Sequence, residues 1–164
     1  MNADNHSRQG VKVKILLVDD SLFIQRENHR VLERAGHEVF CAEDGEAALR
    51  LAEERPVDII LLDLLLPKIS GLEVLQRLKA NPATSAIPVV ILSSLSEKNR
   101  DKLIAAGAED YFEKSLLMPQ RDQNLLPKVL EDIIQRIKSR RPPGSLMPDR
   151  HATTSPNNAA IHQT

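Results

Sequence analysis

The sequence is poor in aromatic residues, in cysteine and in long apolar runs. Aromatic residues make up 2% of the 164 residues and tryptophan is absent, which argues against a base-stacking platform. The single cysteine, Cys41, excludes an intramolecular disulfide. Cys41 lies within the apolar stretch Glu38–Ala42, so we expect it to be a small buried core residue.

Signals for membrane insertion or secretion are also lacking. The longest apolar run, around Ile59–Leu66, is interrupted by Asp63 and is far too short to span a bilayer. The first ten residues are polar and contain no hydrophobic signal region. The formal net charge of -1 provides no general attraction to nucleic acid or to anionic membranes. We therefore expect a cytoplasmic protein with neither nucleic acid nor membrane as a partner.

Short apolar runs alternate with amphipathic segments along residues 12–139. The apolar runs predict strands, whereas the amphipathic segments and their Gly and Pro boundaries predict helices. Repeated alternation of strand and helix predicts an α/β domain in which a doubly wound, five-stranded parallel sheet has helices on both faces. The predicted strands are Val13–Val18, Glu38–Ala42, Val57–Asp63, Pro88–Ser93 and Glu109–Glu113, and the last predicted helix is Leu125–Ser139.

Two helices carry more detailed predictions. In the first, Leu22–Ala35, we expect the apolar residues to cover the sheet; they are Phe23, Ile24, Val31 and Leu32. In the fourth, we expect Ser96 to be the N-cap residue.

The ends of the chain differ from this core. Residues 1–11 are polar, and residues 140–164 are rich in Pro, Ser, Asn and Arg, so both segments are predicted to be disordered.

Acidic side chains follow two of the predicted strands. Asp19 and Asp20 follow the first strand and Asp63 closes the third, while Ser93 closes the fourth and Lys114 follows the fifth. The carboxyl ends of parallel strands meet at one edge of a sheet, where chemistry collects. Carboxylates brought together there repel one another, and Mg²⁺, which prefers oxygen ligands, relieves that repulsion. Asp63 is then placed to act as a nucleophile toward phosphorus, with Lys114 and Ser93 stabilising the transferred group.

Each of these residues has a simpler interpretation when taken alone. An aspartate at a strand end is usually solvated, an Asp-Asp pair often caps a helix, and a lysine after a strand is usually a surface residue. The functional interpretation depends on their occurrence at successive strand ends of one predicted sheet.

Four motifs resemble those of the receiver domains of response regulators. The resemblance covers roughly residues 12–139, and the motifs have the family's order and spacing. It implies a flavodoxin-like (βα)5 fold with strand order 2-1-3-4-5. The motifs are ILLVDDS (Ile15–Ser21), DLLLPKISGLEVL (Asp63–Leu75), PVVILSS (Pro88–Ser94) and GAEDYFEK (Gly107–Lys114).

The resemblance also implies a role for each matching position in a magnesium site. Asp63 resembles the phosphoacceptor, which also binds the metal. Asp20 resembles a direct Mg²⁺ ligand, and Asp19 an acid that acts on the ion through water. The backbone carbonyl of Leu65 corresponds to a third protein ligand.

Further positions resemble the family's signalling machinery. Lys114 resembles the lysine that pairs with the phosphoryl group, Ser93 the switch hydroxyl, and Tyr111 the aromatic residue that changes rotamer with it. The implied donor is a histidine kinase or a phosphotransfer protein. Such a domain catalyses only its own phosphorylation and dephosphorylation, and signals through phosphorylation-dependent protein–protein interaction. No recognisable output domain follows, so we expect a stand-alone receiver.

The sequence departs from the family pattern after Lys114. The family usually has a proline there, often preceded by a cis bond, whereas this chain has Ser115, and the loop over 115–124 is longer than usual. In addition, Leu65 and Leu95 occupy positions that border the path of hydrolytic water in the family. Because both are apolar, we expect the phosphoryl group to be hydrolysed slowly.

Three alternatives remain open at this stage. The first is a degenerate receiver that binds proteins without being phosphorylated, which the serine at position 115 allows. The second is a flavin-binding protein of the same fold, although the acidic loop after the first strand and the scarcity of aromatic residues disfavour it. The third is a phosphatase with an aspartyl nucleophile, which would be expected to carry Asp-x-Asp after the first strand rather than Asp19-Asp20-Ser21.

Overall fold

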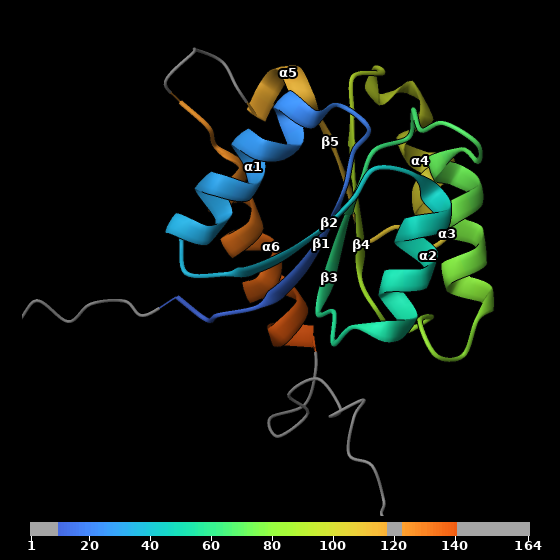
Figure 1. Cartoon of the computed structure of the whole chain (residues 1–164), viewed down its shortest axis with the longest axis horizontal. Coiled ribbons are helices and arrows are strands. Elements are labelled where there is room, and N and C mark those ends of the chain that lie inside the picture. The colour runs from blue at the N-terminus through green and yellow to red at the C-terminus, as the bar shows by residue number, and fades with distance from the viewer. Residues whose placement is uncertain (1–9, 118–122, 141–164) are drawn as a thin grey trace, which may run out of the picture.

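The computed structural model describes residues 10–117 and 123–140 (Figure 1). The predicted disordered ends therefore lie almost entirely outside the described residues. In chain order the elements are β1 (Lys14–Val18), α1 (Leu22–Arg34), β2 (Glu38–Ala42), α2 (Gly45–Glu54), β3 (Ile59–Leu62), α3 (Gly71–Ala80), β4 (Val89–Ser93), a 3₁₀ turn (Glu97–Asn99), α4 (Arg100–Ala105), β5 (Asp110–Glu113), α5 (Lys114–Leu117) and α6 (Leu126–Arg140). None of the helices within these described ranges is long and apolar enough to cross a bilayer.

The sheet has five parallel strands in the order β2-β1-β3-β4-β5. Helices cover both of its faces, with α1 and α6 on one side and α2, α3 and α4 on the other (Figure 1). The predicted α/β class, parallel sheet and strand order are confirmed.

The inner strands are apolar because they are buried on both faces. Neighbouring residues of β1 point to opposite sides, so Leu16 packs in the core under α2 and α3 while Leu17 packs in the core under α1 and α6. Leu61 of β3 continues the second of these cores. Continuous apolar runs of this kind are typical of parallel sheets covered on both faces.

Side-chain oxygens cap the first three helices. Ser21 accepts a hydrogen bond from the backbone N–H of Ile24 at the start of α1, and Asp44 and Ser70 make the equivalent bond in α2 and α3. The predicted cap at Ser96 is wrong. The 3₁₀ turn intervenes, and α4 begins at Arg100 with Asn99 as its N-cap and no side-chain cap bond.

Two predictions of burial are also wrong. Phe23 is 72% exposed, because α1 turns Gln25, Asn28 and Leu32 toward the interior instead. Cys41 is exposed because it lies on β2, an edge strand of the sheet in which most residues are only half-buried.

Candidate functional site

Strand register brings two of the predicted acids together. Val18 of β1 pairs with Leu62 of β3, so the next residues, Asp19 and Asp63, leave neighbouring strands at the same level. Both are buried, at 2% and 4% exposure. Asp20, the following residue, is exposed. One carboxylate oxygen from each of the three acids lies within 4.8 Å of those of the others.

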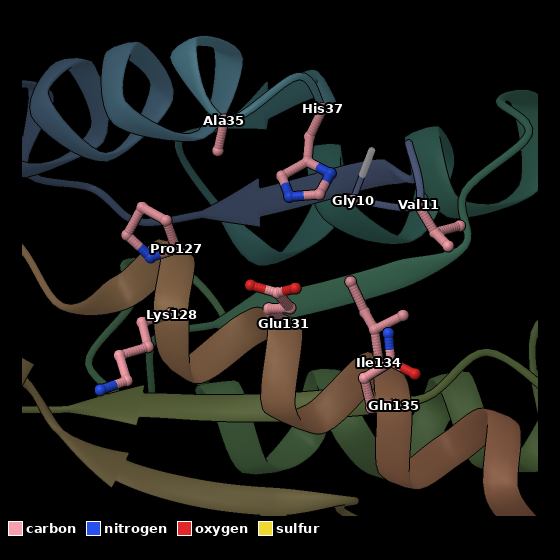
Figure 2. Close-up of a pocket in the computed structure, with 9 residues that line it drawn as sticks. All are labelled: Gly10, Val11, Ala35, His37, Pro127, Lys128, Glu131, Ile134 and Gln135. Carbon is pink, nitrogen blue, oxygen red and sulfur yellow. The ribbon is translucent and has the colours of Figure 1, made fainter. Parts of the chain in front are cut away.

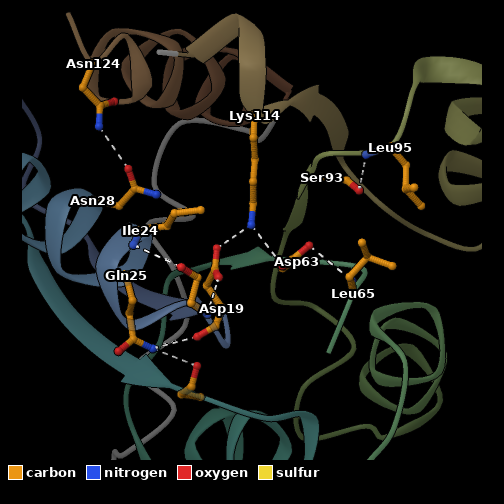
Figure 3. A network of polar contacts seen from close by, with 12 residues as sticks. Asp19, Ile24, Gln25, Asn28, Asp63, Leu65, Ser93, Leu95, Lys114 and Asn124 are labelled. Carbon is orange, nitrogen blue, oxygen red and sulfur yellow. Dashed lines mark hydrogen bonds and ion pairs between the residues drawn. The ribbon is translucent and has the colours of Figure 1, made fainter. Parts of the chain in front are cut away.

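The ammonium group of Lys114 joins the two buried acids. Its Nζ lies 2.6 Å from Oδ2 of Asp19 and 3.0 Å from Oδ2 of Asp63. Figure 3 shows the lysine side chain extending from α5 to a point between them. The predicted meeting of these acids with Lys114 is therefore present, across sequence separations of 95 and 51 residues.

Burial and the charge of the opposite partner shift the pKa values of Asp63 and Lys114 in opposite directions. Burial raises the pKa of Asp63, and the nearby charge of Asp19 adds to that increase, while the hydrogen bond and charge of Lys114 oppose it. For Lys114, burial lowers the pKa, but the bonds to Asp19 and Asp63 outweigh it and the net shift is upward. The lysine therefore stays charged, but its single positive charge faces three carboxyl groups.

The backbone around both acids is held in fixed turns. The second oxygen of Asp19 accepts from the N–H of Ser21 at 2.9 Å, and Oδ1 of Asp63 accepts from the N–H of Leu65 at 3.2 Å. Gly71 completes the second turn by donating its N–H to the carbonyl of Leu64 at 3.0 Å. A Cβ atom on Gly71 would lie 2.2 Å from the carbonyl oxygen of Asp63, so only glycine fits beside Asp63.

The donor set fits a magnesium ion. Mg²⁺ binds through a few carboxylates and keeps several waters, and three carboxylates converge here with one of them, Asp20, open to solvent. Leu65 is 52% exposed at the rim of the cluster. The part of its carbonyl group in binding the ion stays a prediction.

Ser93 and Tyr111 meet at the loop that follows β4. Ser93 is fully buried, and its Oγ accepts from the N–H of Leu95 at 3.1 Å. The hydroxyl of Tyr111, also buried, donates to the carbonyl of Leu95 and lies 3.2 Å from that of Ser96. Both predicted switch residues thus contact the same short loop.

The region after Lys114 differs from the predicted loop. The helical turn α5 begins at Lys114 itself and ends at Leu117, and the hydroxyl of Ser115 donates to the carboxylate of Glu113 at 2.7 Å. No cis peptide bond occurs in the described ranges, which include the Lys114–Ser115 bond. A serine after the lysine therefore permits a regular helical turn without a cis bond.

Sequence reasoning missed three amide side chains that lie on the α1 side of this cluster. Gln25 and Asn28 lie on the buried side of α1, and Asn124 precedes α6 (Figure 3). The available signal for Gln25 and Asn28 was their three-residue spacing within a helix that covers a sheet, since that spacing places both side chains on one face of the helix.

A small pocket lies away from the acids, beside the amino-terminal ends of β1 and β2. Figure 2 shows the His37 ring pointing into it and facing Glu131 of α6. No motif predicted this pocket, because its lining comes from separate segments. The lining residues are Gly10, Val11, Ala35, His37, Pro127, Lys128, Glu131, Ile134 and Gln135.

Comparison with curated proteins relates the chain to bacterial regulators. It is 38% identical to a gliding motility regulatory protein of Myxococcus xanthus over 107 residues, which are 65% of this chain and only 14% of that protein. It is 32% identical to Protein PilH of Pseudomonas aeruginosa over 123 residues, which are 74% of this chain and 97% of PilH.

Comparison with solved structures and family models leads to the same group. The receiver domain of a sensor histidine kinase from Pseudomonas aeruginosa, solved with a magnesium ion coordinated in its active site cleft, superposes with a TM-score of 0.62. The two are 28% identical, and the match covers 77% of this chain and 97% of that one. The family model described as the response regulator receiver domain matches residues 15–125. The chain therefore belongs to the response regulator receiver domain family.

Proposed function

We propose that this domain accepts a phosphoryl group on Asp63 from the phosphohistidine of a histidine kinase or phosphotransfer protein. The observation that carries the proposal is the convergence of Asp19, Asp20 and Asp63 with the ammonium of Lys114. A half-buried lysine held between two carboxylates is a ready partner for a phosphoryl oxygen. The solved receiver domain with magnesium in its cleft supports a metal at the corresponding place.

In the proposed reaction a carboxylate oxygen of Asp63 forms a bond to phosphorus. The bond between phosphorus and the donor nitrogen breaks, and its electron pair stays on the imidazole. Lys114 donates to an oxygen of the transferred group, and the Asp63 oxygen held by the N–H of Leu65 keeps the acceptor oriented. Asp19, Asp20 and Asp63 would hold Mg²⁺, which supplies positive charge against the negative charge of the phosphoryl group.

Phosphorylation would then act on the loop after β4. The added group brings about two negative charges and several acceptor oxygens. The hydroxyl of Ser93, which now accepts from Leu95, can turn to donate to one of these oxygens. Release of Leu95 changes the loop that also binds Tyr111. The change biases two pre-existing conformations and would be read by a partner protein at the face formed by α4, β5 and α6.

Mass spectrometry of the intact protein tests the acceptor directly. The protein is incubated with acetyl phosphate and MgCl₂, beside Asp63→Asn and Asp58→Asn. Asp58 is a matched control because it lies near the other end of β3, where its carboxylate accepts from the N–H of Lys14. We expect one phosphoryl adduct in the parent and in Asp58→Asn, and none in Asp63→Asn or with EDTA.

The absence of an adduct with acetyl phosphate and with a panel of purified phosphorylated histidine phosphotransfer domains would contradict the proposal. A phosphorylation-independent binding module would then be the better description. Retention of the adduct in Asp63→Asn would instead place the acceptor at another residue.

A further inference from the structure

Two buried amides on α1 lie beside the acceptor site. Gln25 is 7% exposed and Asn28 is 6% exposed. They are three residues apart, so they share one face of the helix. A helix face that packs on a sheet is normally apolar, and a buried amide costs free energy unless all of its polar atoms are paired. The hydrogen-bond partners of these two amides therefore indicate which parts of the structure the amides hold in place.

Gln25 ties the acid-bearing end of β1 to the end of β2. Its Nε2 donates to the backbone carbonyl of Asp19 at 3.1 Å and to that of Ala42 at 3.0 Å. Because both partners are acceptors, the NH₂ end of the amide must face them, and both of its hydrogens are used. The N–H of Asp19 also donates to the carbonyl of Ala42, at 3.1 Å. The point at which Asp19 and Asp20 leave the sheet is thus fixed from two sides.

Asn28 anchors the other half of the site. Its Oδ1 accepts from Nδ2 of Asn124 at 3.0 Å, and Oδ1 of Asn124 accepts from the N–H of Leu126 at the start of α6. Leu125, which follows Asn124 in the chain, donates its N–H to the carbonyl of Leu117 at 2.8 Å. Leu117 is the last residue of α5, the helical turn that begins at Lys114. Two hydrogen bonds, joined by the Asn124–Leu125 peptide bond, therefore lead from α1 to the turn that carries the lysine. Figure 3 shows the first of them, between Asn28 and Asn124.

We infer that Gln25 and Asn28 are positioning residues for the acceptor site, each acting on one of its charged halves. Gln25 holds the Asp19–Asp20 turn, and Asn28 holds α5 and hence Lys114, through Asn124. The inference rests on the proposed function, which it deepens. Groups that orient metal ligands without touching the metal typically change metal affinity by about 10–100-fold when they are removed.

Gln25→Met tests the first half of the inference. Methionine has a similar length and volume but donates no hydrogen bond. The matched control is Thr84→Val, which removes a different buried bond, from the Thr84 hydroxyl to the carbonyl of Leu78 at 2.8 Å. Calorimetric titration with MgCl₂ should give a dissociation constant about tenfold higher for Gln25→Met. The value for Thr84→Val should equal that of the parent.

Asn28→Leu tests the second half. We expect its Mg²⁺ dissociation constant to stay within about twofold of the parent, while the rate of adduct formation at saturating MgCl₂ falls about tenfold. Hydrogen exchange of the backbone amides in α5 should be faster in Asn28→Leu and unchanged in Thr84→Val. A purely structural role would produce neither the difference between the two amides nor the local change in exchange.

The possible outcomes separate the inference from the proposed function. If the parent binds Mg²⁺ and forms the adduct, and Gln25→Met and Asn28→Leu both behave like Thr84→Val, only the inference is overturned. If both variants lose Mg²⁺ affinity and adduct formation equally, the division of labour between the two amides is overturned. A parent that neither binds Mg²⁺ nor forms the adduct contradicts the proposed function, and the inference with it.

Discussion

The hydroxyl of Tyr111 donates a hydrogen bond to the backbone carbonyl of Leu95, two residues beyond Ser93. The same residue, Leu95, donates its N–H to the oxygen of Ser93. One residue of the loop after β4 is therefore held at its N–H by the predicted switch hydroxyl and at its carbonyl by the predicted switch aromatic.

Tyr111→Phe should loosen this loop while leaving the core filled. Tyr111 is buried, and loss of a buried hydrogen bond typically costs about 1 kcal/mol of folding free energy. We expect a decrease of that size in urea unfolding, together with faster hydrogen exchange at the amides of Leu95 and its neighbours. Exchange at these amides that matches the parent would show that the hydroxyl does not restrain the loop.

Gly71→Ala should strongly destabilise the domain. The added Cβ would lie 2.2 Å from the carbonyl oxygen of Asp63 and 2.6 Å from Cα of Leu64, and neither backbone atom can move aside easily. We expect a loss of about 3 kcal/mol in urea unfolding, a value at the upper end for overpacking. Gly10→Ala is the control, since nothing lies within 4 Å of its added Cβ. Equal stability of the two variants would contradict the close approach.

His37 should make folding sensitive to mild acid. Burial lowers the pKa of His37, and the charge of Glu131 only partly opposes this effect. The unfolded chain therefore takes up the proton more readily than the folded one. The stability associated with neutral His37 is fully present above its ordinary pKa and is lost as the pH falls through the lowered value.

Urea unfolding at pH 8 and at pH 5 measures this effect. We expect the decrease in stability between the two pH values to be smaller in His37→Gln than in the parent. Thr84→Val, which removes a buried hydrogen bond to the carbonyl of Leu78 and changes no titratable group, should keep the pH dependence of the parent. If all three proteins showed the same pH dependence of stability, His37 would not be the cause of the decrease at low pH.

If Asp63 accepts the phosphoryl group as proposed, Leu65→Asn should shorten the lifetime of that group. Leu65 and Leu95 are exposed apolar side chains at the rim of the site, and neither can orient a water molecule by hydrogen bonding. An asparagine amide can do so. After removal of excess acetyl phosphate, intact mass measured over time in MgCl₂ should show slow loss of the adduct in the parent and severalfold faster loss in Leu65→Asn. Ile104→Asn, an equivalent change on α4, should decay like the parent.

Much of the fold could be predicted because its signals are local. Apolar runs such as Val13–Val18 and Val57–Asp63 identify buried strands directly, and acids placed just after them fall at one edge of the sheet. Strand order was different in kind. It came from the resemblance to a family, because alternation alone does not say which strand lies beside β1.

The errors share a physical cause, since each depended on which elements pack over a residue. Cys41 was predicted to be buried from its apolar neighbours in sequence, but exposure followed from the position of β2 at the sheet edge. Phe23 was predicted to face inward, and Gln25 received no role, because hydropathy assigns the aromatic residue to the core and the amide to solvent. The pairing of Gln25 with the carbonyls of Asp19 and Ala42 reverses that preference.

The exposed position of Cys41 has a practical consequence. It is the only thiol among 164 residues, and the chain has no tryptophan and one tyrosine, so its intrinsic fluorescence reports little. A maleimide dye or spin label can therefore be attached at a single defined place on β2 without engineering the sequence. Partial burial of the thiol and the charge of Glu33 raise the pKa of Cys41, so conjugation will be fastest in mildly alkaline buffer. The unmodified chain thus carries its own attachment point for an optical or magnetic reporter.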